Sequence, residues 1–224
     1  MAMFIVKPWY RKAVNPDDYF DPITHIATEE NFIKFLECGV YDSKYIGYKV
    51  QLGNSVDYNN GLWVIADVNH DSANTGQTDC YDLISEDCFT AAGFSNSTNV
   101  WRNSDVRTWL NGTFYNGMSS PFRGHLILMK YNSAGSWYSD DNILLLSGTE
   151  INANTGVTEG VAYPIFTDAA SRVVKIYNTA QTGYYWTRTK GSLNYVWNID
   201  TDGLIYNQHY NKDALYRRTV MRVH

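Results

Sequence analysis

The sequence predicts an α+β fold in which most strands pair antiparallel. Two apolar runs, HLILMKY and NILLLS, are nearly continuous and are typical of central strands. Other strand-like runs are separated by the turn signals Asn59-Asn60-Gly61 and Asp202-Gly203, which favour hairpins. The helix-like runs are few and short and begin at capping residues. This mixture, with no internal repeat and no low-complexity tract, is the pattern of an α+β chain.

The N-terminal part is irregular before it becomes helical. Three prolines interrupt residues 1–27, so this stretch is interpreted as an arm or connector. A short helix is expected next, with Thr28 as its N-cap, two glutamates in its first turn and Gly39 after its end. From Gly47 the pattern changes to strands, first YKVQLG and then LWVIADV.

The best-marked helix lies in the middle of the chain, in WRNSDVRTWLNGTFYNGM. Its cap is expected at Asn103 or Ser104 and its end at Asn111-Gly112. Beyond the two apolar strands, a second short helix is expected from Thr167, and the last strand is TVMRV. Five large side chains at inward-facing positions are expected to share one core. They are Trp101, Trp109, Leu110, Trp186 and Trp197.

The composition is that of a folded chain with many aromatic residues. The 224 residues fit one domain, or one domain with an appendage, which buries roughly 70% of the surface of the unfolded chain. Aromatic residues make up 15%, which favours a recognition surface or a β-rich core over disorder. The net charge of −5, with lysines and arginines mostly scattered, argues against a nucleic-acid partner.

The cysteines and histidines predict no metal site and no cofactor. Cys38, Cys80 and Cys88 form no CxxC or Cys/His spacing, and reduced thiols are expected, with a Cys80–Cys88 bridge as the alternative. The five histidines share no metal-ligand spacing. No apolar run reaches 18 residues, which argues against membrane insertion. The apolar start is too short for a signal peptide, so an external location would require another carrier.

The last forty-two residues, Gly183 to His224, are rich in Tyr, Asn, Asp and His. Tyrosine supplies rigid amphipathic area at low entropic cost, and asparagine supplies adaptable polar contacts, as in antibody paratopes. The segment is therefore interpreted as a contact surface. The alternative is a surface hairpin that is rich in Tyr and Asn without a binding role.

The order of five motifs carries a family resemblance. They are WRNSDVRTWLNGTFYN, NILLLSGTE, YPIFTDAASRV, YYWTRT and VWNIDTDGLIYN. Together they resemble a bacterial and phage family with the C-type-lectin-like fold of the formylglycine-generating-enzyme type. The resemblance implies short helices packed on a small, mostly antiparallel sheet with long loops. It covers residues 47–224 as a ligand-binding domain and leaves residues 1–46 as an N-terminal arm and short helix, a connector or assembly segment.

Several such domains resemble the variable proteins of diversity-generating retroelements, in which Asn codons of a template are diversified on a fixed scaffold. The implied scaffold positions are Trp186, Arg188, Val196, Trp197, Gly203 and Val220. The implied contact positions, within residues 193–216, are Leu193, Tyr195, Asp200, Tyr206, Asn207, His209, Tyr210, Asn211, Asp213, Leu215 and Tyr216. The chain departs from the family in its last strand, where the usual Gly-Val-Arg-Pro-like ending is replaced, and at Gln208, which an Asn codon does not readily reach.

The sequence supports a catalytic function less well than a binding function. The enzyme that lends the fold its name uses paired late cysteines, and this chain has none after Cys88. A glycosidase needs two carboxylates across a cleft. The available pairs are Asp140 with Asp141 and Glu150 with Asp168. Acidic residues in such loops are usually solvated or capping, so no catalytic residue is assigned.

Two further polar groups are expected to be structural. Glu150 and Arg172 are interpreted as a pair that holds the loop core together. The stretch Trp197-Asn198-Ile199-Asp200 is only superficially similar to a lectin calcium motif. Strand alternation places Asn198 and Asp200 on one face, but calcium needs 6 to 8 oxygen ligands, so no metal is assigned.

The sequence thus predicts a non-enzymatic receptor- or ligand-binding protein of a phage tail or cell surface. Its expected partner is a bacterial surface protein or glycan receptor. Other virion or surface subunits are expected to bind through the N-terminal arm, and homo-oligomers are compatible with the aromatic face. The competing prediction is a structural virion component that uses the same face for assembly, and a carbohydrate-active enzyme comes third.

Overall fold

The structure is a computed structural model that describes residues 14–133, 135–211 and 215–224. It confirms the α+β class. In this part of the chain the largest sheet has seven strands, in the order β1-β2-β3-β4-β13-β5, and β8 also pairs with β13. The strands are β1 (Ile26–Thr28), β2 (Lys49–Leu52), β3 (Gly61–Val68), β4 (Tyr81–Ser85), β5 (Leu126–Ile127), β8 (Ile143–Leu145) and β13 (Thr219–Val223). Only β1 and β2 pair parallel within it.

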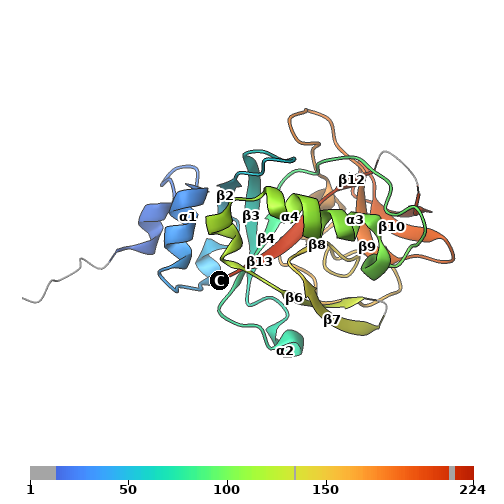
Figure 1. Ribbon diagram of the computed structural model, residues 1–224, viewed down its shortest axis with the longest axis horizontal. Helices are drawn as coiled ribbons and strands as arrows, with labels where there is room; N and C mark the ends of the chain where they lie inside the picture. The colour runs from blue at the N-terminus through green and yellow to red at the C-terminus, as the bar shows by residue number, and fades with distance from the viewer. Residues whose placement is uncertain (1–13, 134, 212–214) are drawn as a thin grey trace, which may run out of the picture.

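Two smaller sheets complete the strands of the described chain. A four-stranded sheet has the order β11-β10-β9-β12, and β6 pairs with β7. Their bounds are β6 (Met129–Ser133), β7 (Ser136–Asp141), β9 (Tyr185–Lys190), β10 (Tyr195–Ile199), β11 (Ile205–His209) and β12 (Tyr216–Arg217). In Figure 1 the strands β9, β10 and β12 lie at one end of the long axis, and helix α1 lies at the other.

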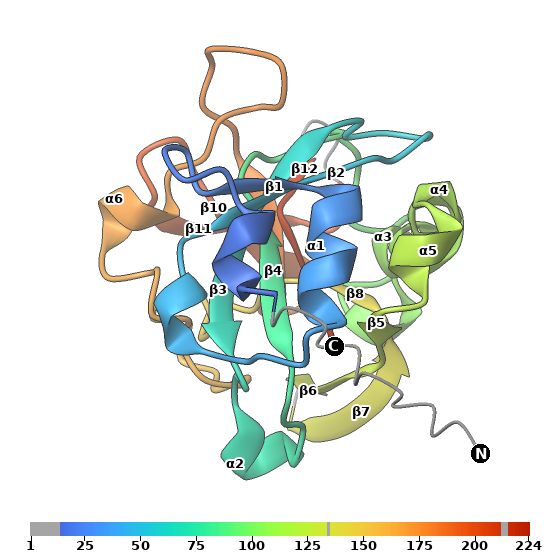
Figure 2. The same ribbon diagram turned by 90° about the vertical axis from the view of Figure 1, so that its left-hand side faces the viewer.

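The N-terminal helix forms where the sequence predicts it. Helix α1 (Glu29–Leu36) is capped by Thr28, whose side chain accepts a hydrogen bond from the backbone N–H of Asn31. Its buried face packs with Phe20 and Tyr45 in the same core as the main sheet. Figure 2 shows α1 in front of that sheet. The described part of the expected N-terminal arm, from Val14 on, therefore shares the core of the larger unit.

The remaining helical elements are short. The α-helices are α2 (Ser72–Thr75), α3 (Asp105–Trp109), α4 (Tyr115–Gly117), α5 (Ser120–Arg123) and α6 (Ala169–Arg172). The 3-10 helices are η1 (Pro16–Tyr19), η2 (Ser43–Tyr45) and η3 (Trp101–Asn103). The cap at Ser104 is confirmed, because its side chain accepts from the N–H of Arg107. Helix α6 is likewise capped by Asp168, which forms a capping box with Ser171, close to the expected start.

The expected end of the middle helix at Asn111-Gly112 is wrong. Helix α3 continues through a π-helical segment, η4 (Leu110–Phe114), into α4. The Asn111 side chain donates to the carbonyl of Ile143 and accepts from the N–H groups of Asn142 and Ile143. The amide that indicated a helix end thus fastens the helix to β8, and the wider π turn belongs to that junction.

The expected core of five large side chains is confirmed for three of them. Trp101, Leu110 and Trp186 are fully buried. Trp109 and Trp197 are only half-buried, so the expectation for these two is wrong. Trp109 packs against the core and carries a guanidinium on its ring.

The polar core corrects the pairing expected for Glu150. Its carboxylate binds Arg188, with both Nη atoms at 2.6 Å, while Arg172 donates to the carbonyls of Asn152 and Gly203. Spacing along the chain does not reveal which cation a buried carboxylate meets in three dimensions. The described cysteines are free, as expected.

Candidate functional site

The segment predicted to make contacts folds into the four-stranded sheet. Strand β10 pairs with β11 and β9, and β9 pairs with β12. Direct cross-strand partners share a face of the sheet. Asn198 in β10 pairs with Tyr206 in β11 on one side and with Trp186 in β9 on the other. Trp186 in turn pairs with Arg217 in β12. These four side chains therefore form one row across one face.

A hollow of about 240 Å³ opens on this face. Its lining residues are Tyr184, Asn198, Asp200, Tyr206 and Gln208. We call it the Asn198 hollow. The two tyrosines are exposed, whereas Asn198 has no exposed surface. The expectation that Asn198 and Asp200 share a face is confirmed, because both line this hollow.

The Asn198 amide is unusual because it is buried without partners. Among the described residues, neither its Nδ2 nor its Oδ1 has a hydrogen bond. A buried polar group left unpaired costs about 1–3 kcal/mol. The buried Asn54 shows the usual arrangement, since its amide donates to Phe114 and accepts from Val56 and Asp57. The hydrogen-bonding groups of Asn198 thus have no partner in the described chain.

Strand alternation divides the expected contact residues between two faces. Tyr206 lies on the face of the Asn198 hollow and is 53% exposed. Tyr195 lies three residues before Asn198 in β10, so strand alternation places it on the second face. There it opposes His209, with ring centroids 5.9 Å apart. Asn207, which is exposed, opposes Trp197 on that second face. A ligand that rests flat on one face therefore meets only part of the expected set.

Other expected contact residues have structural surroundings. Leu215 is buried in the core, and Tyr210 and Tyr216 are half-buried against it. Asp200 is buried, and its Oδ1 accepts from the N–H groups of Asp202 and Leu204 in the hairpin turn. These placements assign the four side chains to support of the sheet more than to display.

The remaining expected positions lie at loop ends. Leu193 is 85% exposed at the turn between β9 and β10, and its carbonyl accepts from Asn99. Asn211 is exposed, and its Oδ1 lies 2.7 Å from Nδ1 of His209. Asp213 lies outside the described residues.

Three lining residues were not among the expected contacts: Tyr184, Asn198 and Gln208. The resemblance does not imply a contact at Gln208, because an Asn codon does not readily give it, yet its place in β11 puts it beside Tyr206 on the same face. A period of two applied from Tyr206 would have found it. The lack of partners for Asn198 has no signal in the sequence.

A second hollow of about 260 Å³ lies near the opposite end of the residue row, beside α3 and β12. Its wall includes Trp109 and Arg217, with the exposed Asn211 and Asp105 also lining it. We call it the Arg217 hollow. The guanidinium carbon of Arg217 lies 4.1 Å from the centre of the Trp109 ring.

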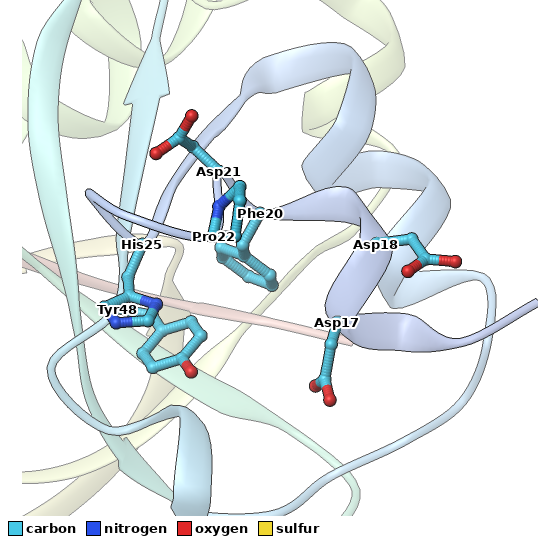
Figure 3. Close-up of a pocket in the computed structure, with 7 residues that line it drawn as sticks. All are labelled: Asp17, Asp18, Phe20, Asp21, Pro22, His25 and Tyr48. Carbon is cyan, nitrogen blue, oxygen red and sulfur yellow. The ribbon is translucent and has the colours of Figure 1, made fainter.

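A third hollow, at the N-terminal layer, is shown in Figure 3. His25 stacks on Tyr48 there, with ring centroids 4.4 Å apart. The carboxylates of Asp18 and Asp21 point away from the ring of Tyr48 in this view. Asp21 accepts three hydrogen bonds from its own loop, and Asp17 binds Lys44 and Tyr45. Two of the three acidic groups therefore already have local partners.

A polar cluster around His70 has the residue types of an acid–base site. Nδ1 of His70 lies 2.8 Å from Asp67, and the imidazole stacks on Tyr163 at 3.7 Å. Tyr163 donates to Asp82, which pairs with Arg222. The cluster is enclosed in the core, which favours a structural role.

Over the described ranges, no group of three His, Cys, Asp or Glu side chains is placed to hold a metal ion, and no helix could cross a membrane.

Comparison with protein-family models gives a match to a family described as a domain of unknown function, DUF6273. The match covers residues 82–223. No curated protein and no solved structure matches the chain. The matched residues run from β4 through β13 and include the lining of the Asn198 and Arg217 hollows. Because the match spans more than half of its length, the chain belongs to the DUF6273 family.

Proposed function

We propose that this chain is a non-enzymatic ligand-binding protein that holds a glycan in the Asn198 hollow. The observation that carries the proposal is the buried, unpaired amide of Asn198. Burial of this unpaired amide costs free energy on folding, and a ligand that forms hydrogen bonds with it recovers that free energy on binding. A site built to hydrogen-bond a ligand discriminates strongly against analogues that lack the matching group.

The chemistry of the lining favours a sugar. An amide side chain offers one acceptor oxygen and two donor hydrogens, which match neighbouring hydroxyls or an acetamido group. Tyr184 and Tyr206 supply exposed rings at the rim, which can pack on the apolar face of a sugar ring. Gln208 adds a second amide. The hollow is smaller than a drug-sized pocket, so one monosaccharide unit of a longer glycan is the fitting occupant.

The wider setting is part of the same proposal. A C-type-lectin-like scaffold on a phage tail or cell surface would present this sheet to a bacterial surface glycan. The residue types at exposed positions, such as Tyr206, Asn207 and Asn211, support a diversified segment. A nearby reverse-transcriptase gene and a template copy of the coding region for residues 193–216, with Asn codons at these positions, would support diversification. A genome without them would remove that part.

Two tyrosines on opposite faces of the hairpin provide a matched test. Tyr206 lines the Asn198 hollow, whereas Tyr195, 39% exposed, lies on the other face. Wild type, Tyr206→Ala and Tyr195→Ala are applied to an array of bacterial surface oligosaccharides. We expect Tyr206→Ala to weaken the best interaction roughly tenfold or more, because stacked aromatics are frequent hot spots, and Tyr195→Ala to stay within about twofold. Equal losses, or no glycan bound by wild type, would contradict the proposal.

Self-association is the second candidate, and two exposed leucines favour it. Leu193 is 85% exposed and Leu204 is 47% exposed, both at ends of β10 or β11. Apolar side chains of this kind are common in assembly interfaces. Sedimentation of wild type and of Leu193→Ser, Leu204→Ser at micromolar concentration decides between the roles. A stable oligomer that the double variant dissolves favours assembly through the hairpin, and a monomer in both leaves the face free for a ligand.

A further inference from the structure

Arg217 differs from the other buried arginines of the described chain. Arg188 and Arg222 bind carboxylates, and Arg172 and Arg218 donate to backbone carbonyls. Arg217 is 5% exposed, and its Nε and Nη1 have no hydrogen-bond partner within the ranges that the structure describes. A buried charge is normally paired, because removing it from water is costly.

The surroundings of Arg217 compensate this charge only in part. One face of the guanidinium lies on the Trp109 ring, a favourable cation–π contact that leaves Nε and Nη1 without hydrogen bonds in the described chain. Burial lowers the pKa of Arg217 to about 10, with a small opposing effect from Asp57. The group is therefore still protonated at neutral pH, and it lines a hollow large enough for a small ligand.

We propose that the Arg217 hollow is a binding site for the carboxylate of a ligand. A carboxylate is planar and matches the fork of guanidinium N–H donors. The hollow offers one cation, and Asp105 on its wall repels a second negative charge, which favours a monoanion over a dianionic phosphate. Asp105 itself accepts two hydrogen bonds from Asn96. Ser95 and Asn211, also in the wall, add polar groups beside the cation.

This site is independent of the Asn198 hollow, and its test uses small probes. Acetate is titrated against the neutral acetamide, and the indole N–H signal of Trp109 is followed by NMR. Two further pairs identify the source of the carboxylate. They are D-glucuronate against D-glucose, for an acidic sugar, and N-acetylalanine against its amide, for a peptide C-terminus. Phosphate at the same ionic strength tests the preference for a monoanion.

The expected result is a saturable shift of the Trp109 signal with acetate and none with acetamide. Arg217→Met keeps the length of the side chain and removes its charge, so it should weaken acetate binding roughly tenfold or more. Its melting temperature should equal or exceed that of wild type, because an unpaired buried charge is removed. The neighbouring Arg218→Met, which loses its hydrogen bonds to Ser85 and Arg172, should lower the melting temperature.

Three outcomes would overturn the proposal. Equal shifts with acetate and acetamide would show that charge is not recognised. A fall in melting temperature for Arg217→Met as large as that for Arg218→Met would give Arg217 a structural role. Tighter binding of phosphate than of acetate would refute the carboxylate assignment. Preference for glucuronate or for N-acetylalanine supports the shared chemistry and identifies its source.

Discussion

Replacing Asn198 with leucine tests whether its amide serves the fold or a ligand. The matched control is Asn54→Leu, since both asparagines are buried. The two side chains differ in their partners. Asn54 makes three hydrogen bonds to backbone groups, whereas Asn198 makes none within the described chain. Leucine has nearly the shape of asparagine but no polar atoms, so each change removes the hydrogen-bonding capacity of one amide.

The two changes should move stability by different amounts. Asn54→Leu leaves the carbonyl of Phe114 and the N–H groups of Val56 and Asp57 without their partner. An unpaired buried group costs about 1–3 kcal/mol, and only the hydrogen bond to Phe114 is fully buried, so a total loss of about 2–4 kcal/mol is expected. Asn198→Leu leaves no described group unpaired and removes two unsatisfied atoms. It should therefore change stability by less than about 1 kcal/mol or increase it by about that amount.

Urea unfolding followed by tryptophan fluorescence gives the two free energies of unfolding. We expect Asn54→Leu to lower the urea midpoint clearly and Asn198→Leu to leave it unchanged or raise it. A loss of about 2 kcal/mol or more for Asn198→Leu, which is the scale of one unpaired buried group, would refute a ligand-binding role of the amide. The amide would then support the fold, and the Asn198 hollow would lose its basis as a binding site.

Three further predictions concern the scaffold. Burial lowers the pKa of His70, but its hydrogen bond to Asp67 and the charges of Asp82 and Glu150 outweigh this and raise it above 6.5. Its stabilisation is therefore complete below pH 6.5 and is lost as pH rises through the folded-state pKa. The difference between the urea midpoints of wild type and His70→Gln should narrow as pH rises above the unperturbed value, and a constant difference would contradict this. Gly203→Ala should cost about 2–4 kcal/mol in the same assay, because φ is +76° and a Cβ would lie 1.8 Å from the carbonyl oxygen of Ala169; an unchanged midpoint would refute that geometry. Glu150→Gln should cost about 3–5 kcal/mol, because Arg188 would stay buried without its anion, and a loss below about 1 kcal/mol would argue against that pairing.

Local features of this fold could be predicted from the sequence. The cap at Thr28, the end of the helix before Gly39 and the turn at Asp202-Gly203 all depend on neighbouring residues, and each was found where expected. Strand β4 (Tyr81–Ser85) was missed, although it is buried at every position between β3 and β13. It lacks the alternation and the flanking turn that would mark a short strand.

Features that depend on tertiary contacts could not be predicted. Asn111-Gly112 has the chemistry of a helix end, but docking against β8 overrides it. Glu150 was paired with Arg172, whereas folding brings Arg188 to it. The contact segment was located as a segment, but its division between two faces follows from the β10–β11 register. A slip of one residue in that register would exchange the faces, so the sequence alone did not define the site.

The side-chain amide signals of Asn198 provide the most direct test of glycan binding in the Asn198 hollow. They are recorded by ¹⁵N NMR while the tightest-binding glycan from the array is added, with the amide of Asn54 as internal reference. The proposed site predicts that the Asn198 signals shift and saturate with the same Kd as binding, while those of Asn54 stay in place. Saturated glycan binding that leaves the Asn198 signals unmoved would contradict the claim.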